Sequence, residues 1–143
     1  MAKPDPALLD IARYPFHVSM QTRFGDLDVN MHVNNVALIG ILEDSRVRFH
    51  AASGFHIAMD GWTAMVASLT IEYLAQMYYP EPLDVHCGAA SFGRTSYRIN
   101  QLVTQGERVV AFADAVMVCV RDGKGFPIPD SFRTSAQAWR LLP

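Results

Sequence analysis

The segment from residue 35 to 53 constrains the fold most, because it predicts one long helix that is apolar almost all round in its first half. Val36 to Leu42 carries no charge, whereas Glu43 to Arg48 is strongly charged. Asn34 is a good N-cap for this helix, and Gly54 is placed to end it. A helix with no polar face must be buried, so the rest of the chain has to surround it.

Alternating or continuously apolar segments predict five strands, which could surround the helix. The last of them is apolar on both faces apart from Asp114, which is typical of a central strand, and its alanines would let a helix approach closely. The order of elements predicts an α+β fold in which the four later strands form an antiparallel meander and the sheet curls around the helix. The predicted strands are Phe16 to Arg23, Thr63 to Tyr73, Leu83 to Phe92, Thr95 to Thr104 and Arg108 to Arg121.

The length of 143 residues predicts a single domain, with a loosely held lead-in at 1–15 and a tail at 126–143 that has room for a short helix. The 12 basic and 14 acidic residues give a net charge of −2, which argues against a dedicated nucleic-acid binder. Cys87 and Cys119 form no CxxC pair, so we expect neither a disulfide framework nor a metal site. Neither a signal peptide nor a membrane-spanning run is present, which predicts a soluble, cytoplasmic protein.

The chemically richest stretch is the loop that leads into the long helix. Unpaired N–H groups and the positive end of the dipole lie at a helix start, where they can stabilise an oxyanion. A carboxylate beside them can act as a base or a nucleophile towards a carbonyl group. The same residues would equally suit a polar loop in which they only satisfy one another. They are Asp26, Asp28, Asn30, His32, Asn34 and Asn35.

This loop resembles the motif of hotdog-fold thioesterases of the 4-hydroxybenzoyl-CoA thioesterase type. The pattern is D-x-D-x-x-x-HVNN followed by E-x-x-R, and the similarity extends from about Phe16 to Arg121. Residues 28–35 are closer still to the D-x-N-x-HVNN motif of acyl-ACP thioesterases from plant plastids and bacteria, which usually contain two fused hotdog units. The matching residues are Asp26, Asp28, His32, Val33, Asn34, Asn35, Glu43 and Arg46, with TIEYL at 70–74 and GRTSYR at 93–98.

The resemblance implies a role for each matching residue. Asp28 would be the catalytic carboxylate, Asn30 and His32 would assist it, and backbone amides near Asn35 and Val36 would polarise the thioester carbonyl. The substrate would be an acyl thioester of CoA or acyl carrier protein, with no separate cofactor. The family also implies a homodimer with a continuous sheet, often paired again into a tetramer, with active sites at the dimer interface.

Three residues depart from the family pattern. Met31 stands where many CoA thioesterases have Gly, Leu38 replaces a frequent helix aromatic, and Gln76 stands where the acyl-ACP branch has Glu.

Arg94 lies in a turn between strands. It would either contact a phosphate of CoA or an acidic carrier surface, or simply be solvated. We therefore expect an acyl thioesterase, with a non-catalytic acyl-thioester-binding module as the main alternative. A hydroxyacyl dehydratase is a weaker one, because HVNN is not the motif of those enzymes.

Overall fold

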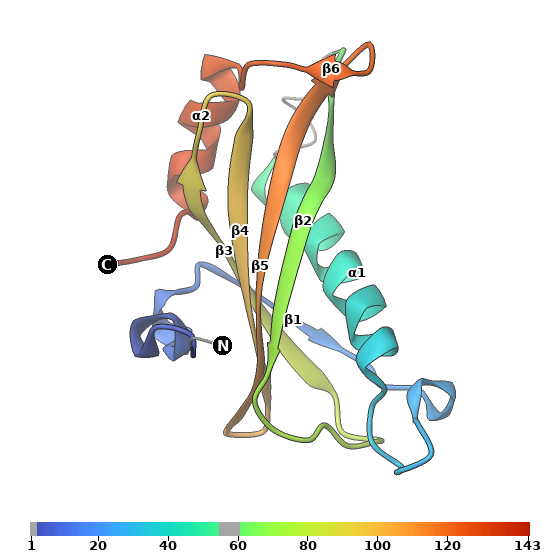
Figure 1. Cartoon of the computed structure of the whole chain (residues 1–143). Helices are drawn as coiled ribbons and strands as arrows, with labels where there is room; N and C mark the ends of the chain where they lie inside the picture. The colour runs from blue at the N-terminus through green and yellow to red at the C-terminus, as the bar shows by residue number, and fades with distance from the viewer. Residues whose placement is uncertain (1–2, 55–60) are drawn as a thin grey trace.

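The computed structural model describes residues 3–54 and 61–143, which form one long helix against a curled antiparallel sheet (Figure 1). The predicted α+β class, with one long helix and five main strands, is confirmed, and a two-residue strand is added at the end of the sheet. The elements are β1 (Phe16–Met20), α1 (Asn35–Ser53), β2 (Thr63–Tyr73), β3 (Leu83–Phe92), β4 (Ser96–Gln105), β5 (Arg108–Arg121), β6 (Lys124–Gly125) and α2 (Asp130–Ala136).

The order of strands in the sheet is β1-β3-β4-β5-β2, and β6 also pairs with β5. Only β3, β4 and β5 form a meander, so the predicted four-strand meander is wrong. A meander would have left β5 at an edge, although its two apolar faces are typical of a central strand. The structure instead pairs β2 with β5 from Thr63 opposite Val120 to Tyr73 opposite Ala111, which places β5 inside the sheet.

The helix α1 lies across the concave face of this sheet, but its apolar first half is not buried all round as expected, because the sheet covers one side only and leaves Val36 68% and Ile39 43% exposed. Asn34 accepts a hydrogen bond from the Val36 amide on its side-chain oxygen (2.9 Å), and Gly54 ends the helix with φ of 76°. Neither α1 nor any other helix in the described part of the chain has the length and apolar run required of a membrane-spanning segment. The buried core joins Leu38, Ile41, Leu42 and Phe49 of α1 to Ala111, Ala113 and Ala115 of β5.

A polar network crosses the same helix–sheet interface. Arg46 is only 4% exposed, and its Nη1 donates to Gln101 Oε1 on β4 at 2.8 Å. Gln101 Nε2 in turn donates to Ser45 Oγ (2.7 Å) and to the Leu42 carbonyl (3.0 Å). Burial lowers the pKa of Arg46, because the surrounding core disfavours its charged form. These directional bonds fix how α1 sits along β4.

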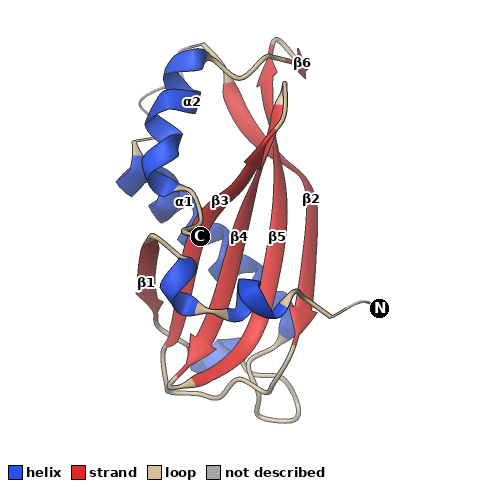
Figure 2. Cartoon of the chain, turned by 90° about the vertical axis from the view of Figure 1, so that its left-hand side faces the viewer, coloured by secondary structure: helices blue, strands red, loops and turns tan. Residues whose placement is uncertain are grey.

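The N-terminal turns cover part of the convex face of the sheet, where the last residues of the chain meet them (Figure 2). Short 3-10 turns at Pro6–Leu9 and Ile11–Arg13 lead to Tyr14, which packs in a second cluster with Leu102 and Phe112. The Leu142 amide donates to the Arg13 carbonyl at 2.7 Å, and this hydrogen bond links the C-terminal residues to the N-terminal turns. The lead-in is thus tied to the end of the chain, and the tail contains the short helix α2.

Replacing Gln101 with Leu tests the buried network. Gln101→Leu removes the acceptor for Arg46 and leaves its charge buried, so we expect the free energy of unfolding to fall by about 3 kcal/mol. The double variant Arg46→Met, Gln101→Leu removes both partners and should recover most of that loss. Urea denaturation measures both values. A single variant as stable as the wild type would show that the network contributes little.

Candidate functional site

The loop before α1 closes on itself at one end of the molecule (Figure 1). The Asp28 amide donates to the His32 carbonyl at 2.9 Å, and the Met31 amide donates to the Asp28 carbonyl at 3.0 Å. Leu27 and Val33 pair across the base of this turn as an isolated antiparallel bridge. Met31 completes the turn with φ of 61°, a left-handed backbone conformation that favours glycine. The backbone that a glycine would adopt is therefore retained despite the methionine.

The carboxylate of Asp28 is held by its own turn through one oxygen. Oδ1 accepts hydrogen bonds from the amides of Asn30 (2.8 Å) and His32 (3.3 Å). Oδ2 accepts no hydrogen bond from any residue in the described part of the chain. The side chain is half-buried and lines a cavity of about 400 Å³. One oxygen thus orients the group while the other is available for chemistry.

The wall of this cavity combines the start of α1 with the end of β2. Asn35 is the first helical residue, and its amide donates to no described residue, whereas the Val36 amide is already bonded to Asn34. The Tyr73 hydroxyl lies 3.5 Å from the Asn35 carbonyl and links the two elements. Asp28 and Asn35 therefore line one cavity. Its lining residues are Asp28, Val33, Asn35, Tyr73, Leu74, Ala75, Gln76 and Met77.

The other residues expected in the site are not among those that line this cavity. Asn30 is exposed at the turn, and His32 packs edge-on against the Tyr78 ring with centroids 5.3 Å apart. The Val36 side chain is 68% exposed and lines a different cavity beside α1. Arg94 lies in the β3–β4 turn, at the opposite end of the sheet from the start of α1 (Figure 1). The structure brings together Asp28 and Asn35, and the roles of the other four stay predictions.

Residues 73–77 complete the cavity, and sequence reasoning did not assign them to the site. Gln76, which departs from the acyl-ACP pattern, lines the cavity with Asp28. No local signal marks Tyr73 or Met77, because strand ends of this kind are common. Only the placement of β2 at the edge of the sheet beside α1 brings this segment to the helix start.

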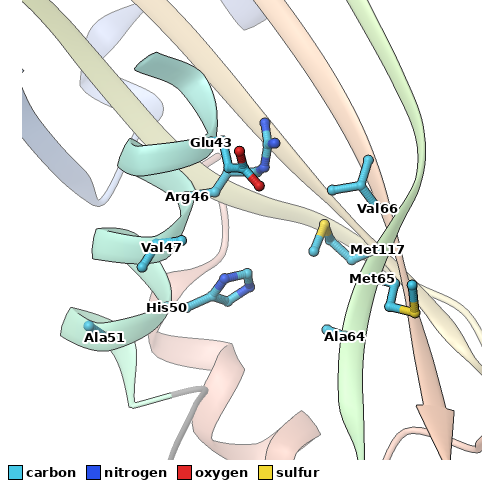
Figure 3. Close-up of a pocket in the computed structure, with 9 residues that line it drawn as sticks. All are labelled: Glu43, Arg46, Val47, His50, Ala51, Ala64, Met65, Val66 and Met117. Carbon is cyan, nitrogen blue, oxygen red and sulfur yellow. The ribbon is translucent and has the colours of Figure 1, made fainter. Parts of the chain in front are cut away.

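A larger cavity of about 670 Å³ lies farther along α1, between the helix and β2 (Figure 3). It begins near Glu43, roughly two helical turns beyond Asn35. Glu43, Arg46 and His50 extend from α1 on one side, and strand residues face them from the other. His50 Nε2 lies 3.0 Å from the Tyr97 hydroxyl. The remaining lining is apolar and consists of Val47, Ala51, Ala64, Met65, Val66 and Met117.

A central helix wrapped by an antiparallel sheet, with a carboxylate-lined cavity at the start of that helix, defines a hotdog-fold protein. Residues 22–135 match the thioesterase-like superfamily, and the chain belongs to that superfamily. The resemblance drawn from the HVNN motif is thereby confirmed. No curated protein matches the chain.

Solved structures agree with this assignment. A thioesterase from Thermus thermophilus, complexed with coenzyme A and Zn, is 27% identical and superposes with a TM-score of 0.80, covering 92% of this chain and 98% of that one. A protein described as a predicted thioesterase from Bacillus stearothermophilus is 25% identical, with a TM-score of 0.80 and coverage of 90% and 98%. A gentisyl-coenzyme A thioesterase shares the fold at 16% identity, with a TM-score of 0.74 and coverage of 85% and 98%.

Substituting glycine for Met31 tests the left-handed turn beside Asp28. The side chain is 59% exposed, so its loss removes little packing, while relief of the left-handed conformation should raise the free energy of unfolding by about 1 kcal/mol. Asp122→Gly is the matched control, because Asp122 also has a positive φ of 52° but aspartate tolerates it better. Thermal unfolding should show the larger gain for Met31→Gly. A loss of stability there would contradict the strain argument.

Proposed function

We propose that this protein hydrolyses an acyl thioester of CoA or acyl carrier protein to a free acid and a thiol. The observation that carries the proposal is that Asp28 and Asn35 line one cavity at the positive end of α1, where the Asn35 amide donates to no described residue. Membership of the thioesterase-like superfamily supports the same reaction class. The coenzyme A bound to the 27% identical Thermus thermophilus thioesterase supports CoA as the thiol carrier.

In the proposed reaction, Asp28 takes a proton from a water molecule as the water oxygen bonds to the thioester carbon. The carbonyl electrons move to its oxygen, and the Asn35 N–H donates a hydrogen bond to the oxyanion. Collapse of this intermediate breaks the carbon–sulfur bond, and the thiolate takes the proton from Asp28. Asp28 could instead attack the carbon directly, expel the thiolate and form a mixed anhydride, which water then cleaves.

The larger cavity is the proposed receptor for the acyl group. Its lining is mainly apolar, and its volume of about 670 Å³ suits a sizeable hydrophobic ligand (Figure 3). Apolar residues occupy the positions between the two cavities: Ile39 on α1, and Leu69 and Ile71 on β2. Met65 and Met117 add adaptable side chains to the wall. An acyl chain would therefore run along α1, away from Asp28.

The proposal includes a homodimer. β2 is an edge strand, and Met65, Val66 and Tyr73 leave large apolar surfaces exposed along it. Val36 and Val47 expose further apolar surface on α1. An open edge flanked by apolar side chains favours pairing with another strand, and a second copy of β2 would continue the sheet.

Light scattering tests this assembly. We expect the mass of a dimer, or of a tetramer built from two dimers, for the wild-type chain. Met65→Lys with Val66→Lys places charge on the β2 edge and should shift the mass to that of a monomer. Ile11→Lys is the control, because Ile11 is also exposed, at 52%, but lies in the N-terminal turn. A monomeric wild type would refute the dimer.

Asparagine in place of Asp28 tests the catalytic carboxylate. Asn retains an oxygen that can accept from the Asn30 and His32 amides, so the turn should be preserved while the base is lost. We expect thiol release to fall by at least about 100-fold. The assay uses a panel of aliphatic and aromatic acyl-CoAs and acyl-ACPs with a thiol-reactive dye. The preferred substrate in the panel also identifies the acyl class.

Asp44→Asn is the matched control for that experiment. Asp44 is an exposed carboxylate whose contact is Arg48 at 2.9 Å, and its loss should leave thiol release unchanged. If the wild type binds acyl-CoA without releasing thiol from any substrate, the protein is a binding module and the proposal is wrong. An enoyl product from a hydroxyacyl thioester would instead identify a dehydratase.

A further inference from the structure

A row of two rings and a guanidinium group borders the Asp28 cavity. The His32 ring packs on the Tyr78 ring, with centroids 5.3 Å apart. The Arg108 guanidinium carbon lies 5.3 Å from the centre of the same Tyr78 ring. Arg108 Nη1 also donates to the carbonyl of Gln76, a residue that lines the cavity, at 3.2 Å. Arg108 therefore contacts the wall of the proposed active site through Gln76.

No carboxylate among the described residues neutralises the charge of Arg108. Its hydrogen bonds go to the Gln76 carbonyl and to Gln105 Oε1, and both acceptors are uncharged. No carboxylate of a described residue lies within ion-pair distance of it. Three other arginines are each paired with an aspartate, namely Arg23 with Asp26, Arg48 with Asp44 and Arg98 with Asp114. Arg108 thus offers an exposed positive charge to an anion from outside.

A buried side chain holds this arrangement in place. Gln105 is 1% exposed, and its Oε1 accepts from the Tyr78 amide at 2.9 Å as well as from Arg108 at 3.3 Å. Its Nε2 donates to the carbonyls of Tyr78 (2.7 Å) and Glu81 (3.0 Å). One glutamine therefore fixes both the tyrosine and the arginine. The guanidinium loses less freedom on binding an anion than an unsupported surface arginine would.

We propose that Arg108, supported by Tyr78 and Gln105, binds a phosphate group on the thiol-bearing half of the substrate. This inference rests on the proposed function. The thiol of both CoA and acyl carrier protein is carried by a pantetheine arm that ends in a phosphate. With the thioester at Asp28, the arm leaves through the cavity mouth past exposed aromatic rings, and a guanidinium group is well suited to phosphate oxygens. Arg94 lies at the far end of the sheet within this chain.

Steady-state kinetics of Arg108→Gln test the proposal on three substrates with one acyl group. We expect KM for the acyl-CoA to rise about tenfold with kcat little changed, because a charge-assisted contact is lost. Acyl-pantetheine, which has no phosphate, should react equally with variant and wild type. Raising the ionic strength should increase KM for acyl-CoA in the wild type more than in the variant.

The acyl-ACP substrate identifies the source of the phosphate. A rise in KM for both acyl-CoA and acyl-ACP assigns the contact to the phosphopantetheine phosphate, and a rise for acyl-CoA alone assigns it to the nucleotide phosphates. Arg121→Gln is the matched control, because Arg121 ends the same strand and lies over an aromatic ring, Phe126, at 5.4 Å. This variant should behave as the wild type does.

Two outcomes would overturn the inference while leaving the hydrolase proposal intact. If Arg108→Gln leaves KM unchanged for every substrate, Arg108 contacts no phosphate. If it impairs acyl-pantetheine as much as acyl-CoA, Arg108 acts through the shape of the Gln76 segment. Failure of the wild type to release thiol from any of the three substrates contradicts the proposed function itself, and Arg108 then has no phosphate of a thioester substrate to bind.

Discussion

The burial of β5 inside the sheet determines where the other elements lie. Ala111, Ala113 and Ala115 are fully buried in the core that β5 shares with α1, and β5 is flanked by strands on both sides. β2 occupies one side and β4 the other, so two strands separate β2 from β3 in the sheet. Residues 74–82 have to cross the end of the sheet where α1 begins. The cavity at Asp28 is a consequence of that crossing.

Local signals account for most of what the sequence predicted about the fold. The bounds of α1 follow from the Asn34 cap and the left-handed Gly54, and the bounds of β2, β3 and β5 follow from alternation and turn residues. The strand order was not predictable in this way, because periodicity reports which faces are buried and not which strands are neighbours. The two-sided apolar pattern of β5 already contradicted a meander ending at that strand. The contacts of the lead-in were not predictable either, because the partners of Tyr14, Leu102 and Phe112, are distant in sequence.

The residues of the candidate site also fall into two groups, those that a local motif predicts and those that only the tertiary structure brings to the cavity. Asp28 and Asn35 could be predicted together, because they lie on the loop and helix start that one motif specifies. Tyr73 and Gln76 reach the cavity only through the position of β2 at the sheet edge. Arg108 starts a strand with no motif around it, and only its contact with Gln76 relates it to the site. The unengaged amide also required the structure, because the sequence could not show that Asn34 occupies the Val36 N–H.

The sequence alone leaves two interpretations of the loop at Asp28 open, a catalytic site and a polar turn whose groups only bond to one another. The structure of the turn is compatible with both. A loop whose polar groups satisfy one another would use both oxygens of the carboxylate, whereas here two amides hold Oδ1 and no described residue engages Oδ2. The bonds that cap the turn therefore also orient the free oxygen, and the left-handed Met31 keeps the turn closed. A carboxylate fixed in this way needs little reorganisation to act on a carbonyl held in the cavity. In the proposed reaction, the same hydrogen bonds would both cap the turn and orient the catalytic carboxylate.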